Sequence, residues 1–179
     1  MLGPEIVACQ PWFAVKVRTR GEARVSDSLR NRDHEVFLPT CVESRPCSDR
    51  IKKVSVALFP GYVFCRLDAK LRQTVLTTPG VDHIVGSGGW PTPIPESEIA
   101  AVRSIINSRV AAVPWPYLTV GRRIRVEYGA LTGLEGLVVR AGDSERLVVS
   151  VHLLQRSVSV EIDRSWIQPI PDFSARKIA

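Results

Sequence analysis

The chain has 179 residues, a length that fits one ordinary domain or two small ones. Its hydrophobic fraction of 45% is sufficient for folded cores and too high for a disordered protein. No stretch approaches the roughly 18 apolar residues that span a bilayer, and the N-terminus lacks the pattern of an export signal. We therefore expect a folded, cytoplasmic protein that makes no contact with a membrane.

The formal net charge is +6. Before Pro114 the chain carries 15 basic and 11 acidic residues, and from Pro114 onward it carries 9 basic and 7 acidic residues. This mild excess suits a polyanionic neighbour, but it suits plain solubility equally well. Charge alone therefore leaves nucleic-acid binding open.

Neither the cysteines nor the histidines indicate a reactive site. The four cysteines are too scattered for close zinc-binding pairs: Cys9, Cys41, Cys47 and Cys65. The three histidines have no nucleophile or carboxylate at a recognisable catalytic spacing: His34, His83 and His152. We expect no metal, no cofactor and no enzymatic activity, with Cys65 a small core residue of an apolar strand.

Aromatic and β-branched runs alternate with amphipathic segments in the first part of the chain. Strands are expected at 12–17, 36–38, 54–59, 61–67 and 81–85, and helices at 21–32, at 69–77 and from Pro95 onward. Asp68 is expected to cap the second helix, and the polar stretch 40–53 predicts a loop or a hairpin tip. This order of elements predicts an α+β fold, a ferredoxin-like α/β sandwich.

Helical periodicity also predicts which side chains of these helices face inward. They are Val25 and Leu29 in the first helix, Leu71, Val75 and Leu76 in the second, and Ile99, Val102, Ile105 and Ile106 in the third.

A proline-containing stretch, 111–119, predicts a linker of limited stiffness, and beyond it the hydrophobic period becomes two. Ile124, Val126 and Tyr128 alternate with charged residues. Farther on, Val158, Val160 and Ile162 alternate with Ser157, Ser159 and Glu161. With 137–139 and 147–151 between them, about five short strands predict a small β-barrel.

Three segments combine glycines with apolar or aromatic residues. Leu58–Phe64 places a rigid Pro-Gly turn between aromatic rings, which can hold them at a surface and predicts a docking patch. Gly129–Gly136 forms a turn between strands. Gly86–Trp90 suggests a phosphate-binding loop, but no Lys-Ser/Thr pair and no helix follows it directly. We expect an ordinary loop there.

Four features occur in a characteristic order: Trp12-Phe13 opening a strand, Phe59-Pro60-Gly61-Tyr62, Thr78-Pro79-Gly80-Val81 leading to 86–89, and Val120-Gly121 with 129–136. Together they resemble the NusG family of bacterial transcription elongation and antitermination factors. The resemblance covers residues 12–170. It implies a NusG N-terminal domain at 10–110, a linker at 111–119 and a KOW domain, a small SH3-like barrel, at 120–171. A monomeric protein is expected.

The leading segment, Leu58–Phe64, and the short linker resemble specialised paralogs such as RfaH more than the housekeeping factor. Two departures bear on DNA recognition: Pro79 stands where RfaH-like proteins carry a basic residue, and Arg72-Gln73-Thr74 does not reproduce their polymerase-contacting turn. Sequence-specific DNA recognition of that kind is therefore not expected.

The resemblance implies a docking site for RNA polymerase, in which an apolar socket receives the clamp helices of the β′ subunit. The residues concerned are Phe59, Tyr62, Phe64 and Ile84. Aromatic side chains suit such an interface because they desolvate large areas with few rotors to freeze. Alternatively, these four side chains belong to the core of the sandwich.

A basic cluster lies at the end of the first strand and the start of the first helix: Lys16, Arg18, Arg20 and Arg24. Cations and exposed helix amides can meet phosphates there, and the resemblance implies contact with the upstream non-template DNA strand. The alternative is a solvated basic face. For Arg50, Lys52 and Lys53 we expect solvation.

Leu131 and Leu134 occupy the turn between the first two strands of the predicted barrel. The resemblance implies that they meet either the NusE ribosomal protein or the Rho terminator. Leucine at a turn could instead fold beneath the barrel. The function implied is a non-enzymatic factor that bridges the polymerase clamp, suppresses pausing and recruits a second machine. The alternative is an RNA-binding or ribosome-associated KOW protein.

Overall fold

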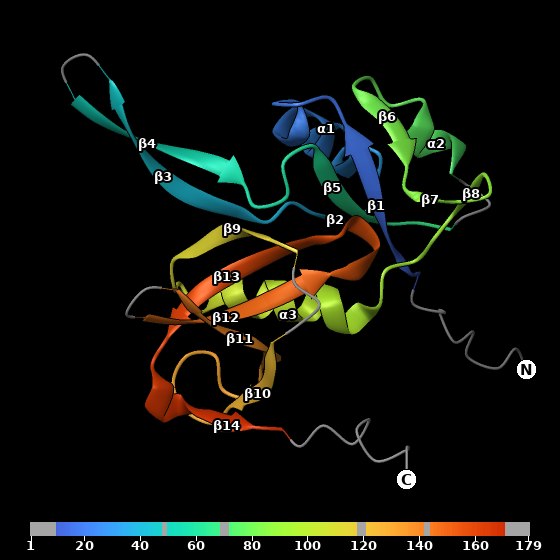
Figure 1. Cartoon of the computed structure of the whole chain (residues 1–179). Helices are drawn as coiled ribbons and strands as arrows, with labels where there is room; N and C mark the ends of the chain where they lie inside the picture. Colours follow the sequence, from blue (N-terminus) through green and yellow to red (C-terminus); the bar gives the residue numbers. More distant parts are fainter. Residues whose placement is uncertain (1–9, 48–49, 69–71, 118–120, 142–143, 171–179) are drawn as a thin grey trace, which may run out of the picture. The chain divides into compact units, whose positions relative to one another are not determined.

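The computed structural model describes residues 10–47, 50–68, 72–117, 121–141 and 144–170 (Figure 1). This part of the chain has a mixed α/β structure in two compact units. The first unit contains residues up to Leu38 together with Gly61–Glu96, and the second contains Pro39–Pro60 and residues from Ser97 onward. Among the described residues, no helix is long and apolar enough to cross a bilayer.

The first unit is built on a four-stranded antiparallel sheet in the order β2-β5-β1-β6 (Figure 1). Its elements in chain order are β1 (Trp12–Val17), α1 (Glu22–Arg30), β2 (Val36–Phe37), β5 (Tyr62–Arg66), α2 (Gln73–Leu76) and β6 (Val81–Ile84). Both helices pack against one face of this sheet through Val25, Leu29 and Val75. The inward positions expected for Val25 and Leu29 are confirmed, since both side chains are buried.

Strand register assigns the two faces of the sheet. Phe13 pairs with Cys65 and Val15 with Val63, so these residues share the face covered by the helices. Trp12, Phe37 and Phe64 lie on the opposite face, where the Phe37 ring centroid is 6.4 Å from that of Trp12 and 6.1 Å from that of Phe64. Aromatic rings therefore fill this second face as well.

An arginine network closes the end of the same face. The Arg66 guanidinium lies 4.7 Å from the centroid of the Trp12 ring and forms ion pairs with Glu35 at 3.0 Å and Glu96 at 2.8 Å. Arg66 also donates to the backbone oxygen of Gln10 at 2.8 Å. A guanidinium that stacks on one side and is paired on the other tolerates partial burial.

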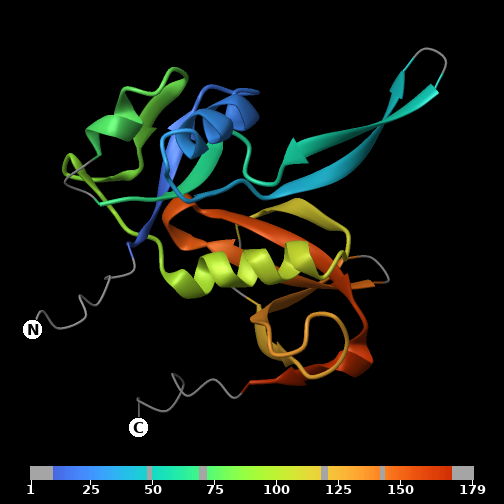
Figure 2. The ribbon, with the colours of Figure 1, turned by 180° about the vertical axis from the view of Figure 1, so that it is seen from behind.

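The second unit contains a six-stranded antiparallel sheet in the order β14-β10-β11-β12-β13-β9 (Figure 1). Its strands are β9 (Ala112–Pro116), β10 (Arg122–Val126), β11 (Glu135–Ala141), β12 (Ser144–Val151), β13 (Arg156–Ile162) and β14 (Ile167–Pro169), with short 3-10 turns at His152–Leu154 and Arg164–Trp166. Helix α3 (Glu96–Asn107) runs beside the sheet (Figure 2). The predicted strands between Arg123 and Ile162 are confirmed, except that β10 ends at Val126 and Tyr128, expected on the face of Ile124 and Val126, is 67% exposed.

The polar side of β13 is not solvated as its alternation suggests. Ser157 and Ser159 are 2% and 0% exposed, and the neighbouring Val158 and Val160 are also buried. The Ser157 hydroxyl lies 2.7 Å from that of Ser150 on β12. Both faces of this strand are therefore covered, a condition that a period of two in one strand does not reveal.

The stretch 40–53, expected as a loop or a hairpin tip, forms most of a long hairpin. Its strands are β3 (Thr40–Cys47) and β4 (Arg50–Ala57), paired from Thr40–Ala57 to Cys47–Arg50. Within the described residues this ribbon pairs only with itself. The strand expected at 54–59 is confirmed over residues 54–57, which form the end of β4. Residues 40–53 are mostly polar and lack a clear apolar alternation, so the hydrophobic pattern could not predict the rest of the ribbon.

Three further elements differ from the sequence-based expectation. Helix α2 begins at Gln73 with Arg72 at its N-cap, so the predicted cap by Asp68 is wrong, and Leu76 is 36% exposed. Leu71 lies outside the described residues. The expected loop after β6 contains a small hairpin of β7 (Gly86–Ser87) and β8 (Trp90–Pro91).

The most consequential difference concerns the expected linker. Ala112–Pro116 form β9, which pairs with β13 along five register positions. Strand β9 is at the edge of the sheet, where proline is tolerated because no further strand needs its missing N–H. The prolines that argued for a linker are thus compatible with an edge strand.

Candidate functional site

The Pro-Gly turn predicted as a docking element is fixed by hydrogen bonds on both sides of Gly61. The Gly61 N–H donates to Glu22 Oε1 at 2.7 Å, and the Gly61 carbonyl accepts from the Val17 N–H at 3.0 Å. Gly61 has φ +81, a conformation that disfavours other residues. The turn therefore ties the start of β5 to β1 and α1.

Tyr62 and Lys16 form a single contact on this sheet. They are directly opposite in the β1–β5 register, and the Lys16 ammonium lies 4.3 Å from the centroid of the Tyr62 ring. His83 on β6 is opposite Lys16 on its other side, and its side chain is 60% exposed. Tyr62, Lys16 and His83 therefore form one cross-strand row, which we call the Tyr62 row.

The four residues expected to form an apolar socket do not share one surface. Phe59 and Phe64 are 1% and 0% exposed, whereas Tyr62 is half-buried. Ile84 is opposite Val15 and packs against the core beneath α1 and α2, so it lies on the other face of the sheet from Tyr62 and Phe64. The structure brings Tyr62 next to Lys16 rather than next to Ile84.

The remaining residues of the basic cluster are at the surface. Arg18, Arg20 and Arg24 are exposed, and the structure gives none of them an ion pair among the residues it describes. The Arg18 N–H donates to the Gly80 carbonyl at 3.1 Å, and Arg20 adopts a left-handed φ of 65. These contacts fix the backbone of the β1–α1 connection and leave its cations open to solvent.

The turn 129–136 in the second unit is held by its own backbone. The Gly133 N–H donates to the Val126 carbonyl at 2.7 Å, and the Val126 N–H donates to the Leu134 carbonyl at 3.0 Å. Gly129 has φ +85, and a Cβ there would lie 3.0 Å from the Trp166 ring. This close packing fixes the direction in which Leu131 and Leu134 leave the turn.

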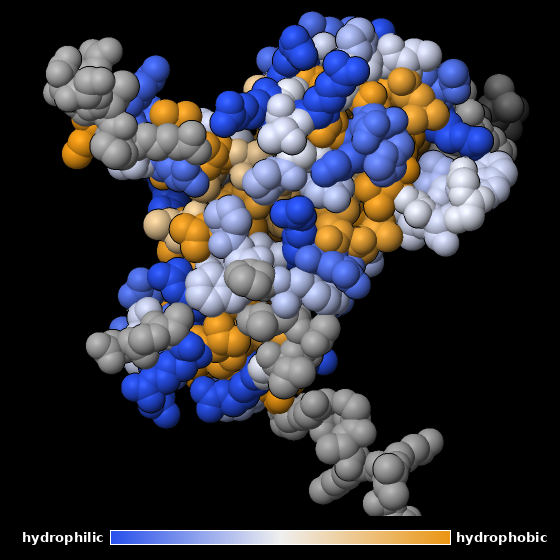
Figure 3. Space-filling model, turned by 45° about the horizontal axis from the view of Figure 1, so that its top comes forward, coloured by the Kyte–Doolittle hydropathy of each residue, from blue (hydrophilic) through white to orange (hydrophobic). Residues whose placement is uncertain are grey.

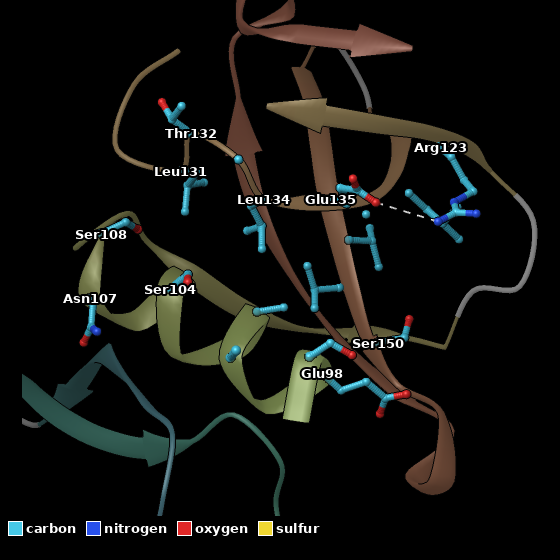
Figure 4. Close-up of a pocket in the computed structure, with 18 of the residues that line it drawn as sticks. Glu98, Ser104, Asn107, Ser108, Arg123, Leu131, Thr132, Leu134, Glu135 and Ser150 are labelled. Carbon is cyan, nitrogen blue, oxygen red and sulfur yellow. Dashed lines mark ion pairs between the residues drawn. The ribbon is translucent and has the colours of Figure 1, made fainter. Parts of the chain in front are cut away.

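Leu131 and Leu134 are 5% and 9% exposed and line a cavity of about 1210 Å³, which we call the α3 cavity (Figure 4). Helix α3 supplies the opposite wall, including Ser104 and Asn107, which are labelled in the figure. The two leucines therefore point into a hollow rather than into bulk solvent.

A polar contact at the α3 cavity could not be found from sequence spacing. His152 Nδ1 lies 2.8 Å from Glu98 Oε1, and the His152 N–H donates to Glu98 Oε2 at 3.2 Å. The Tyr117 ring packs edge-on against His152 with 5.9 Å between ring centroids. These partners are 54 positions apart along the chain, so only the fold brings the histidine and the carboxylate together.

The β3–β4 hairpin exposes apolar and basic side chains together. Val42 and Ile51 are 68% and 74% exposed, and Lys52 and Lys53 are also exposed. Apolar atoms are visible on this hairpin beside its grey tip in the upper left of Figure 3. The side chain of Arg50 lies outside the described part of the structure.

In the described part of the chain, side chains that could ligate a metal or act as a nucleophile are scattered. Among the described residues, no three His, Cys, Asp or Glu side chains gather as a metal site, and Cys41 and Cys65 are free thiols. Burial, with a smaller contribution from Glu35, raises the pKa of the Cys65 thiol to about 12. Cys65 therefore behaves as a small core residue and not as a nucleophile.

The described residues define a mixed α/β protein in two units whose candidate sites are surfaces and a cavity. A family model described as transcription termination factor NusG matches residues 10–103, which is more than half of the chain. The chain belongs to the NusG family.

Curated relatives extend this similarity over most of the chain. A NusG transcription termination/antitermination protein of Helicobacter pylori is 27% identical, over 89% of this chain and 98% of its own. The protein of the same name from Lactococcus lactis is 28% identical, over 90% of this chain and 94% of its own. The fold resembles a solved NusG structure from Thermotoga maritima, with a TM-score of 0.52, 19% identity and coverage of 90% and 98%.

Proposed function

We propose that this protein is a cytoplasmic transcription elongation and antitermination factor whose first unit docks on the β′ clamp helices of RNA polymerase. The observation that carries the proposal is the Tyr62 row, a half-buried tyrosine held under a lysine on the sheet face of a NusG-family N-terminal segment. An anchored aromatic ring with few free rotors suits a polymerase contact. A protein that bridges the two sides of the clamp would disfavour clamp opening, and so would suppress pausing by a population shift that requires no catalytic step.

The arrangement of each unit supports the finer fold assignment that this proposal includes. In the first unit, the order β1, α1, β2, β5, α2, β6 with two helices on one sheet face supports a ferredoxin-like sandwich. In the second, six antiparallel strands, with a turn containing Gly129 and Gly133 between β10 and β11, support an SH3-like KOW barrel.

Within this proposal, Arg18, Arg20 and Arg24 hold the upstream non-template DNA by its phosphates. The exposure of these three side chains supports this assignment, because solvated guanidinium groups can exchange counterions for phosphate. Lys16 has a different role from these arginines, since its ammonium lies over the Tyr62 ring. Its position on β1 places it between the proposed polymerase contact at Tyr62 and the proposed DNA contact that begins at Arg18.

The second unit recruits a further factor, either the NusE ribosomal protein or Rho, through Leu131 and Leu134. Both leucines line the α3 cavity, whose volume of about 1210 Å³ can accept apolar side chains of a partner. Phe64 and Ile84 support the docking surface from within the first unit, because their side chains are buried or half-buried.

Replacement of Tyr62 by alanine tests polymerase docking. Tyr62→Ala should weaken polymerase binding by roughly 1 to 3 kcal/mol, the usual loss for an interface anchor, and should reduce pause suppression in single-round transcription. Tyr128→Ala is the matched control, because Tyr128 is 67% exposed and belongs to the second unit.

The docking assignment is wrong if Tyr62→Ala keeps native circular dichroism and unchanged affinity for polymerase. Purification of the tagged protein from cells separates the alternative function. Recovery of ribosomal RNA without polymerase subunits would favour an RNA-binding or ribosome-associated KOW protein.

A further inference from the structure

The first residue of α1, Glu22, is an acid inside the basic cluster of the first unit. Arg20 and Arg24 lie two positions before and after it. A carboxylate there works against the phosphate contact proposed for these arginines, because it repels the same anion. The structure directs this carboxylate to another element: Glu22 Oε1 accepts a hydrogen bond of 2.7 Å from the Gly61 N–H, 39 positions along the chain.

An acid in the first turn of a helix also interacts favourably with the helix dipole. That attraction needs no particular partner, whereas a bond of 2.7 Å to one backbone N–H does. Among the residues that the structure describes, the Glu22 side chain makes no hydrogen bond to its own helix, and Gly21 at the N-cap has no side-chain cap. The geometry of Glu22 is therefore specific to the Gly61 turn.

Glu22 fixes one of the two peptide groups that flank Gly61. It accepts from the N–H of the group on the N-terminal side, and the Val17 N–H donates to the carbonyl of the group on the C-terminal side at 3.0 Å. The orientations of these two groups set the φ and ψ of Gly61, whose φ is +81. Because glycine has more backbone freedom than any other residue, loss of the Glu22 bond would let the first group rotate.

The Tyr62 side chain depends on this turn directly. Tyr62 is the first residue of β5, and its pair with Lys16 is the last of the β1–β5 register, where a strand ladder opens most easily. A Cβ at Gly61 would lie 2.9 Å from Lys16 Nζ, the atom that lies 4.3 Å from the centroid of the Tyr62 ring. The conformation of Gly61 therefore controls the position of the ring and of the ammonium over it.

We propose that Glu22 is a positioning residue for polymerase docking, which holds the Tyr62 ring in its binding orientation through the Gly61 turn. This inference rests on the proposed function, because it takes Tyr62 as the anchor. Glu22 acts through Tyr62 and not by a contact of its own with polymerase. A ring that is already held loses less freedom on binding, and a ring that samples other orientations binds more weakly in proportion to the competent fraction.

Three substitutions in the full chain separate the hydrogen bond from the charge. Glu22→Ala removes the acceptor, whereas Glu22→Gln keeps a side-chain oxygen that can accept from the Gly61 N–H. Asp27→Ala is the matched control, because it removes one negative charge from an exposed position of the same helix. Affinity for purified RNA polymerase is measured for each variant, alone and combined with Tyr62→Ala, at a temperature well below the unfolding of every protein.

We expect Glu22→Ala to lower the affinity for polymerase about fivefold to tenfold, Glu22→Gln by less than about threefold, and Asp27→Ala not at all. In the Tyr62→Ala background, Glu22→Ala should change the affinity by less than about twofold, because the ring that it positions is absent. A merely structural role would lower the melting temperature and leave the effect on polymerase affinity independent of Tyr62.

Amide and aromatic NMR signals of the free protein report on the turn without polymerase. The Gly61 amide and Tyr62 ring signals should shift in Glu22→Ala and stay in place in Asp27→Ala.

Three results would overturn the role of Glu22 while docking stands: unchanged Gly61 and Tyr62 signals in Glu22→Ala, wild-type affinity of Glu22→Ala for polymerase, or an equal loss with and without Tyr62. If Tyr62→Ala alone leaves polymerase binding unchanged, the docking assignment is wrong and the proposal for Glu22 falls with it.

Discussion

The burial of the Cys65 side chain in the core should make the free energy of unfolding depend on pH. Cys65 lies on the helix-covered face of β5, is fully buried, and has its thiol pKa raised from 9.0 to about 12, chiefly by loss of solvation. In the unfolded chain the thiol ionises near its ordinary value. Above that value, protons therefore leave the unfolded state more readily than the folded state.

The stability contributed by the neutral Cys65 thiol is fully present below pH 9.0 and is lost as the pH rises toward about 12. Between pH 8 and pH 10, we expect the unfolding free energy of the wild type to fall by about 1 kcal/mol more than that of Cys65→Ala. Urea unfolding of both proteins at the two pH values measures the difference. Equal losses would show that Cys65 titrates alike in both states.

Arg18 and Arg24 are the exposed cations with the most direct expected effect on DNA. Replacing both with alanine should reduce the slope of log affinity against log salt by about 1 to 2 for association with a transcription complex. Arg30→Ala is the control, because Arg30 on the same helix is already paired with Asp27 at 3.1 Å. An unaltered slope in the double variant would leave Arg18 and Arg24 as ordinary surface charge.

Buried elements of regular period were predicted well, whereas exposed or very short ones were not. Strand β1 is apolar at every position except Lys16, and α1 has Val25 and Leu29 one turn apart, so one sequence pattern was enough to predict each element. The β3–β4 hairpin has no buried face pattern, and β7–β8 has only two residues in each strand. Such elements depend on turn geometry and pairing, which the hydrophobic period does not record.

The hairpin β7–β8 provides a test of glycine requirement within one turn. Gly86→Ala should disrupt it, because a Cβ would lie 1.9 Å from the Trp90 carbonyl oxygen, a backbone atom that cannot move alone. Gly88→Ala should cost only about 1 kcal/mol, because its Cβ is unobstructed and only the positive φ is unfavourable.

Amide hydrogen exchange and the indole resonance of Trp90 report on this hairpin locally. We expect faster exchange and a shifted indole signal in Gly86→Ala, with smaller changes in Gly88→Ala. Equal effects of the two substitutions would show that the close approach at Gly86 does not hold the hairpin.

The sequence predicted individual residues of the candidate site, but it did not predict which of them would be in contact. Tyr62 and Lys16 were each singled out from sequence, yet their contact depends on the register of β1 against β5. The sequence alone did not assign Ile84 to a face; its pairing with Val15 places it on the face covered by the helices. Residues far apart in sequence become neighbours only through pairing and packing that no local pattern specifies.

The six-stranded sheet of the second unit should fold without the first 109 residues of the chain. A fragment of residues 110–179 keeps β9 through β14, and we expect β-type far-ultraviolet circular dichroism and dispersed amide resonances. A helical form is unfavourable, since Gly129, Gly133 and Gly136 would each cost a helix interior about 1 kcal/mol relative to alanine.

The fragment 117–179 isolates the contribution of β9, because it lacks the five residues that pair with β13. It should melt at a lower temperature than the fragment 110–179. Predominantly helical spectra in either fragment would contradict the expected fold, and equal melting temperatures would show that β9 adds nothing to the sheet.

The position of β9 also limits how far the sheet of the second unit can travel from α3. With β9 paired, only residues 108–111 separate Asn107 from Ala112, which allows a span of about 17 Å. If β9 dissociated from the sheet edge, the segment connecting α3 to the sheet would run from Asn107 to Arg122 and could span about 50 Å. A longer connecting segment lets the sheet meet more distant partners but lowers their effective concentration. The pairing of the five residues of β9 therefore decides between a longer accessible distance and a higher effective concentration.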